Sequence, residues 1–273
     1  MHLSPDVTTV ENLTPDAGPG LMSLLPPNLM SSNPAQTAPS PAPFGIGFET
    51  GPMVIEHGRD RLFALVERQL TNLFEYDPCA DAGPLQAALE VTLNRVSHCF
   101  SRIVLKRYQQ DGAARFSPFH SGQYCIFLYY LSHTLARQGA SGLADRVYYL
   151  NRALNGVDLF HQVDLPEVFC VEHPLASVIG RAQIGDCFFF AQGVTVGGNK
   201  GAYPVIGRHV SMLSNSKVVG RSVIGDHVIL SANCYVKDAE IPPHSIVFGQ
   251  DRNLIIKNNP GGLTNDIFAN DQA

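Results

Sequence analysis

The chain has 273 residues, a hydrophobic content of 45% and a formal net charge of −5, which allows one or two domains with a sizeable core. The mildly acidic balance argues against nucleic acid as a partner, and no apolar run is long enough to span a bilayer. The six cysteines are scattered without a CxxC pair, which favours a reduced, cytosolic protein with mostly buried thiols.

Residues 1–52 are rich in Pro, Ser, Asn and Gly. They have little to bury, and their prolines block helix formation and strand pairing, so we expect a disordered tail. The stretch lacks a basic segment followed by an apolar core, and it has no arginine before Arg59, which argues against a signal or transit peptide. A docking role for Leu21, Leu24 and Leu25 is the alternative.

Residues 53–155 are predicted to form a helical domain. Helical patterns occur in four segments, which span residues 59–74, 85–105, 117–139 and 142–154. The third segment is apolar nearly all round, so we expect it to be buried between other helices or subunits. It begins with Ser117-Pro118, where the missing N–H of a proline costs nothing.

Residues 156–257 carry a repeat of six residues. Aliphatic or aromatic side chains return at every sixth position on both sides of one short loop, at Val178, Ile184, Phe190, Val196, Ile206, Met212, Val218, Ile224, Leu230 and Val236. This period fits neither an amphipathic helix nor an alternating strand. It indicates a parallel β-helix, in which three hexapeptides close one triangular coil and the apolar side chains stack inward.

A run of β-hairpins is the alternative for these residues, but the paired turn signals that hairpins need are missing. Pro242-Pro243 marks the end of the regular coils, since proline cannot donate to a ladder. Residues 258–273 are polar and rich in glycine, and we expect a flexible C-terminal tail there.

Two motifs resemble the serine acetyltransferases, a family of hexapeptide-repeat acyltransferases. The first is GVDLFHQVDLPEVFCVEHP at 156–174, where Asp158 and His173 stand at the spacing of the family's paired aspartate and histidine. The second is VTVGGNKGAYPVIG at 194–207, which is similar to the family's V-T-L-G-G-T-G-K loop. The resemblance implies an α+β protein with an N-terminal α-helical domain followed by a left-handed parallel β-helix, and acetyl transfer from acetyl-CoA to L-serine.

In the family's chemistry His173 would be the general base and Asp158 its orienting partner. A free hydroxyl is a weak nucleophile near neutral pH, so acetyl transfer from a thioester needs a base. The imidazole pKa of about 6.5 suits this task. A carboxylate on the other ring nitrogen fixes the tautomer and stabilises the imidazolium. The alternative for His173 is a polar core or surface histidine.

The acceptor site follows the family in part. Glu172 stands where the family has an aspartate that helps hold the acceptor's amino group, although a solvated carboxylate is the alternative. Asp111 is a weaker match to a second acceptor-binding aspartate, because the local spacing differs. The family's Arg-His pair, which contacts the acceptor's carboxylate, is replaced by Ala202 and Tyr203. Since a carboxylate is normally met by a charge-assisted bond, a neutral acceptor such as a sugar or glycan hydroxyl is the alternative substrate.

The resemblance also implies that coenzyme A lies along the coils between adjacent subunits, next to Gly197, Gly198, Lys200, Ser214, Lys217 and Ala232. Coil packing is the alternative for the small residues in this set. A homotrimer or a dimer of trimers is implied, because the family's active sites form between neighbouring β-helices. Family members often dock a C-terminal isoleucine into cysteine synthase, but this chain ends NDQA, so we expect no cysteine synthase complex.

Two other classes of protein compete with this interpretation. A metal-dependent hydratase of the carbonic anhydrase type would need histidines that converge on a metal. His209 and His227 lie one coil apart, but at outward corner positions, so we expect solvated histidines and no metal site. A non-catalytic scaffold is the other alternative, and the joint presence of Asp158, His173 and the GGNK loop weighs against it.

Overall fold

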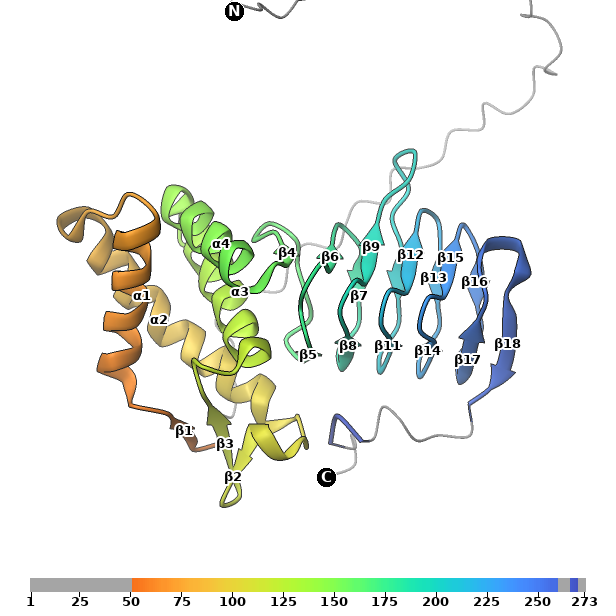
Figure 1. The fold of residues 1–273 in the computed structure, drawn as a ribbon, viewed down its shortest axis with the longest axis horizontal. Coiled ribbons are helices and arrows are strands. Elements are labelled where there is room, and N and C mark those ends of the chain that lie inside the picture. Colours follow the sequence, from red (N-terminus) through yellow and green to blue (C-terminus); the bar gives the residue numbers. More distant parts are fainter. Residues whose placement is uncertain (1–50, 260–265, 270–273) are drawn as a thin grey trace, which may run out of the picture. The chain divides into compact units, whose positions relative to one another are not determined.

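Four α-helices come first in the computed structural model, which describes residues 51–259 and 266–269 (Figure 1). They are α1 Arg59–Leu73, α2 Pro78–Ser101, α3 Ser121–Arg137 and α4 Ser141–Asn155. The predicted tail up to residue 50, with Leu21, Leu24 and Leu25, lies outside the described residues. None of the helices in the described ranges combines the length and the apolarity needed to cross a bilayer.

The start of α2 differs from the prediction, which placed it near residue 85. The Asp77 side chain accepts a hydrogen bond from the Cys79 N–H, and Pro78 takes the first helical position. Both features favour a helix start, so the helix begins about two turns earlier than its apolar pattern. Helix α3 begins later than predicted, at Ser121 and not at residue 117, and His120 is its capping residue.

A small sheet is formed by one strand before α1 and two strands between α2 and α3. Its strands are β1 Met53–Ile55, β2 Gln109–Gln110 and β3 Ala113–Phe116, with β1 parallel and β2 antiparallel to β3. The turn between β2 and β3 is Asp111-Gly112, and both residues have positive φ, 52° and 79°. Asp-Gly is a strong hairpin signal, so this turn was visible in the sequence.

Three sheets of short parallel strands form the coils of a β-helix (Figure 1). The first sheet holds β4 Asp158–Leu159, β6 Val178–Ile179, β9 Thr195–Gly197, β12 Lys217–Val219 and β15 Tyr235–Lys237. The second holds β5 Phe169–Val171, β8 Phe188–Phe190, β11 Ser211–Met212, β14 Ile229–Leu230 and β17 Ser245–Phe248. The third holds β7 Gln183–Ile184, β10 Val205–Ile206, β13 Val223–Ile224 and β16 Glu240–Ile241.

An antiparallel strand, β18 Ile255–Asn258, closes the second sheet by pairing with β17. Two short 3₁₀ helices, η1 Lys106–Tyr108 and η2 Asp251–Asn253, complete the regular structure of the described residues. The order of helices followed by stacked parallel strands confirms the predicted fold class.

The register between coils confirms most of the six-residue repeat. Ile206 pairs with Ile224, and Val218 pairs with Val236, so equivalent positions stack one above another as predicted. The coil that runs from Ile179 to Val196 is different, because Val178 is 41% exposed and Ile179 is buried in its place. Ile179 pairs with Val196, so that coil is one residue shorter than the 18-residue coil from Val218 to Val236, and the six-residue count slips.

Helices and coils share one buried apolar cluster. At their junction the Tyr129 hydroxyl donates a hydrogen bond to the Val163 carbonyl and accepts one from the Leu165 N–H, at 2.7 and 2.8 Å. Tyr130 donates to the Glu167 carbonyl at 2.9 Å. Because these two tyrosines are fully buried on α3, they fix the segment that connects β4 to β5 against the helix.

The described part of the C-terminal tail is packed, which differs from the expected flexible tail. Ile267 and Phe268 are buried, and Phe268 forms a bridge with Ile103. The Val104 N–H donates to the Ile267 carbonyl at 2.9 Å, and the Ala269 N–H donates to the Arg102 carbonyl at 2.8 Å. Two apolar side chains in a polar stretch are therefore enough to return the chain to the end of α2.

Candidate active site

His173 lies at a corner of the coils, just after β5. Its backbone is in the left-handed region with a φ of 52°, and the residue is exposed, as is Glu172 before it. The Glu172 N–H donates to the Phe190 carbonyl at 3.2 Å and ties the corner to the next coil. The imidazole is therefore held on the surface by its backbone, where a substrate can reach it.

Asp158 is bound by side chains of α4. Its carboxylate accepts a hydrogen bond from the Tyr148 hydroxyl at 2.8 Å, and its other oxygen lies 3.8 Å from the Arg152 guanidinium. Both partners come from α4. Burial, followed by the bond to Asp158, raises the pKa of Tyr148, so the hydroxyl remains a proton donor. No hydrogen bond or ion pair joins Asp158 to His173 among the described residues.

Two histidines that the sequence analysis did not single out do meet carboxylates. His161 lies 2.8 Å from Asp145, and His133 lies 3.0 Å from Asp164. Both histidines are buried while their carboxylates are largely exposed. These pairs attach α3 and α4 to the segment after β4, which is a structural task, and neither pair lies at the His173 corner of the chain.

The start of α3 packs directly against the His173 corner. A side chain at Gly122 would meet the Val171 carbonyl at 2.5 Å, so only glycine permits this approach. Partial burial is the main cause that lowers the pKa of His120, and the charge of Arg107 is the next. Among the smaller causes, the charge of Glu172 raises the pKa of the His120 ring and that of His173 lowers it.

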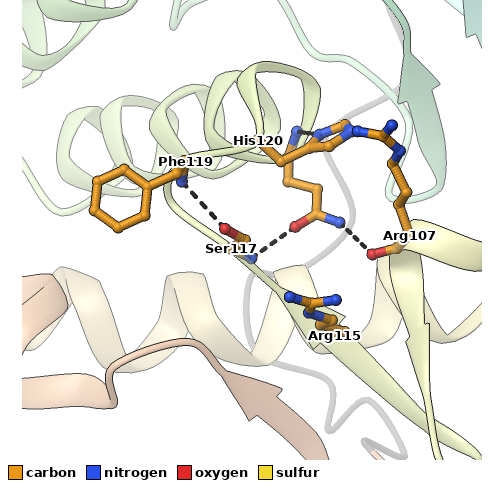
Figure 2. A pocket seen from close by; sticks show the side chains of 6 residues that line it. Arg107, Arg115, Ser117, Phe119 and His120 are labelled. Carbon is orange, nitrogen blue, oxygen red and sulfur yellow. Dashed lines mark hydrogen bonds between the residues drawn. The ribbon is translucent and has the colours of Figure 1, made fainter.

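A cavity of about 350 Å³ opens at this place (Figure 2). It is lined by Arg107, Arg115, Ser117, Phe119, His120 and Gln123. Sequence reasoning missed this cavity. The available signal was the pair of arginines on either side of the Asp-Gly hairpin, but nothing in the sequence tells that the hairpin faces the start of α3.

The other predicted acceptor residues lie elsewhere. Asp111 is at the tip of the β2–β3 hairpin and does not line the cavity. Tyr203 is 48% exposed, and its ring covers the backbone of Gly198, where a side chain would meet the ring at 2.6 Å. Gly198 is therefore explained by Tyr203, whereas Gly197 has open space around its Cα.

The GGNK loop folds into a tight hairpin. The Asn199 N–H donates to the Ala202 carbonyl and the Ala202 N–H to the Asn199 carbonyl, at 2.9 and 3.0 Å. Lys200 and Gly201 form the turn with φ of 49° and 79°. Lys200 is exposed at the tip, so its ammonium group is the cation of this loop.

The remaining residues expected to border coenzyme A lie together on successive coils. The Asn233 N–H, next to Ala232, donates to the Ser214 carbonyl at 2.9 Å. The Lys217 ammonium donates to the Asn215 carbonyl at 3.0 Å. Ser214 is half-buried, and Ala232 and Lys217 are exposed, so the edge offers small residues beside one cation.

The corner histidines stack instead of converging. The rings of His209, His227 and His244 lie face to face, with centroids 4.8 Å apart and planes within 8°. Among the described residues, no three His, Cys, Asp or Glu side chains are grouped in a way that could hold a metal ion. The expectation of solvated histidines is wrong for His209, which is only 5% exposed, because its neighbours in the stack cover it.

Comparison with known proteins points to one class of enzyme, although no family model matches the chain. A serine acetyltransferase of Helicobacter pylori is 28% identical over 158 residues, which take in 55% of this chain and 92% of the relative. A serine acetyltransferase of Mycobacterium tuberculosis is 29% identical over 146 residues, with 52% and 63% covered.

A solved structure supports the fold. The serine acetyltransferase isoform 3 of Entamoeba histolytica, in complex with cysteine, is similar with a TM-score of 0.52 and 22% identity, over 73% of this chain and 74% of that one. At this identity the likeness concerns the arrangement of helices and coils alone. From the sequence relatives and the stacked hexapeptide coils together, the chain is a serine acetyltransferase-like hexapeptide-repeat protein and an acyltransferase.

Proposed function

We propose that the protein is a serine O-acetyltransferase, which transfers acetyl from acetyl-CoA to the hydroxyl of L-serine and so serves cysteine biosynthesis. The observation that carries this proposal is the match to 92% of the Helicobacter pylori serine acetyltransferase. The named relatives give no support to the alternative of a sugar or glycan acceptor, which rests on Ala202 and Tyr203 alone.

In the proposed reaction His173 accepts the proton of the serine hydroxyl. The hydroxyl oxygen forms a bond to the acetyl carbon, and the bond from that carbon to the thioester sulfur breaks. The imidazolium then returns its proton to the departing thiolate, so no covalent enzyme intermediate forms. The exposed corner position of His173 suits this role, and Glu172 beside it would meet the amino group of serine.

Asp158 would act as a positioning residue for His173. A carboxylate has two oxygens, and Tyr148 bonds to only one of them at 2.8 Å. The proposal therefore requires the corner to bring the imidazole to the second oxygen when substrates are bound. Tyr148 would then be a partner in positioning the same carboxylate.

Coenzyme A would bind along the coil edge that carries Ser214, Lys217 and Ala232, with Gly197 near the reacting end. We also propose a homotrimer or a pair of trimers in the cytoplasm. Val205 and Val223 pair in adjacent strands, and their exposed fractions are 40% and 42%. Such an apolar stripe on neighbouring coils is suited to contact with another subunit.

The direct test is thiol release from acetyl-CoA, with L-serine first and a panel of sugars next. We expect release with serine, and His173→Ala should lower kcat roughly 10²- to 10⁴-fold because the general base is lost. His244→Ala is a matched control, since His244 is also exposed at a left-handed corner with a φ of 54°. Equal activity of the wild type and His173→Ala would remove this histidine from the mechanism.

A further inference from the structure

The proposed acceptor carries a carboxylate that lacks its expected cation. Ala202 and Tyr203 occupy the loop positions where the family resemblance implies a cationic pair, and neither carries a positive charge. Lys200 points outward at the tip of a tight hairpin. A buried or half-buried carboxylate without a cation is costly, so another part of the chain must supply the positive charge.

The cavity beside the His173 corner supplies two guanidinium groups. Arg107 forms no ion pair with any residue in the part of the chain that the structure describes. Arg115 lies 3.5 Å from Glu56, and a hydrogen bond from Ser117 is the main cause that lowers the pKa of Glu56. Glu56 thus stays ionised and partly neutralises Arg115, which leaves Arg107 as the stronger attraction for an anion.

The walls of the cavity are fixed by hydrogen bonds from one buried side chain (Figure 2). The Gln123 amide oxygen accepts from the Ser117 N–H at 2.6 Å, and its amide nitrogen donates to the Arg107 carbonyl at 2.8 Å. The Gln123 N–H donates to the His120 ring at 3.3 Å. The backbones of Arg107 and Ser117 and the ring of His120 are therefore tied to one residue, which fixes where the Arg107 side chain starts.

The field of α3 adds to this attraction. The cavity lies at the N-terminus of this 17-residue helix, where His120 is the capping residue. The N-terminus of a helix carries partial positive charge and backbone N–H groups without helical partners. Two arginines and the helix end thus line one space of about 350 Å³, a volume that suits a small amino acid.

We propose that this cavity binds the carboxylate of the acceptor, with Arg107 as its main cation and Arg115 as the second. The inference rests on the proposed function and names the group that selects an amino acid over a sugar. Gly122 lies between the cavity residues His120 and Gln123 and packs against Val171, so we expect a carboxylate held there to leave the rest of a small acceptor on the side of Glu172 and His173. The arginines of the helical part thus replace the cationic pair missing from the loop.

The test compares L-serine with L-serinamide, which keeps the hydroxyl and the amine but lacks the carboxylate. We expect Arg107→Gln to lower kcat/KM for serine about 10- to 100-fold, the loss of one hydrogen bond to a charged group. Activity with serinamide and the KM for acetyl-CoA should stay as in the wild type. Arg115→Gln should show the same pattern with a smaller loss, and Arg107→Lys should recover part of the activity.

The control variant is Arg252→Gln, since Arg252 is an exposed arginine at the far end of the coils. If the wild type acetylates serine and Arg107→Gln keeps the full preference for serine, the inference is wrong and the proposed function stands. A higher KM for acetyl-CoA would instead assign the cavity to a coenzyme A phosphate and also overturn the inference.

A wild type that acetylates sugars but not serine would overturn both proposals. If no acceptor is turned over, calorimetric titration with L-serine and L-serinamide decides the inference. Binding of serine alone, weakened by Arg107→Gln, supports the carboxylate site, and absence of serine binding contradicts it. Circular dichroism of each variant shows whether a loss reflects unfolding.

Discussion

Asp158 belongs to the coils, and its carboxylate is bound by side chains of α4. Tyr148 donates to one oxygen at 2.8 Å, and the Arg152 guanidinium lies 3.3 Å from the same tyrosine hydroxyl. Such a chain of polar contacts holds the carboxylate in one orientation. The spacing of Asp158 and His173 was visible in the sequence, but the competing tyrosine was not, because it approaches from a different helix.

Tyr148→Phe tests whether this orientation matters for acetyl transfer. The change removes one hydrogen bond, worth about 1 kcal/mol, so kcat should fall roughly fivefold while the KM for acetyl-CoA is unchanged. Tyr149→Phe is the matched control, because Tyr149 is 55% exposed and its hydroxyl makes no hydrogen bond within the described residues. A rise in kcat would mean that Tyr148 competes with His173 for the carboxylate.

The cavity residues show why part of the site could not be predicted. Arg107 and His173 are far apart in the sequence, and no motif connects them. Both act on His120, at the start of α3, because this helix packs on β5 through Gly122. Motif spacing predicts residues that share a turn or a coil, whereas this pocket is produced by the packing of two elements.

At the scale of elements, α2 and α4 are joined by a bidentate ion pair between Asp81 and Arg146. The guanidinium donates to both carboxylate oxygens at 2.8 Å. Asp81 is 9% exposed, so the contact is largely shielded from water. The hydrogen bonds from Arg146 are the main cause that lowers the pKa of Asp81, while burial opposes them.

Asp81→Asn should therefore lower the free energy of unfolding by roughly 1.5–3 kcal/mol near neutral pH, the usual range for a charged hydrogen bond. The folded pKa of Asp81 lies below its unfolded value of about 3.9. Its contribution is thus complete above that value and is lost as pH falls through the folded pKa. Urea denaturation at several pH values measures this.

The control for this prediction is Asp60→Asn, an exposed acid in the first turn of α1. A difference in the free energy of unfolding between wild type and Asp81→Asn that stays constant down to pH 2 would contradict the linkage argument.

Helix α2 also illustrates what can be predicted from the sequence, since its start at Asp77-Pro78 is a local signal. The apolar pattern alone placed the start too late because Pro78, Cys79 and Ala80 in the first turn are exposed.

At the scale of the whole molecule, periodicity predicted the coils because each residue stacks on its equivalent in the next turn. The prediction failed at the short coil from Ile179 to Val196, where the six-residue count slips. It also failed at residues 266–269, which lie beyond the repeat. The return of the chain to α2 is a long-range contact made by two residues, Ile267 and Phe268. Two apolar residues in a polar tail have no periodicity, so the sequence alone could not assign them to the core.

Phe268→Ala should destabilise the protein by about 3–5 kcal/mol, the usual cost of truncating a fully buried phenylalanine. Phe268 is 1% exposed and lies against the end of α2 at Ile103. Asp266→Ala is the matched control, because Asp266 is an exposed residue of the same short segment. Thermal unfolding of both variants, followed by circular dichroism, measures the difference. Equal midpoints for Phe268→Ala and the wild type would mean that residues 266–269 do not belong to the cooperative core, and that the helices and coils hold together without this return of the chain.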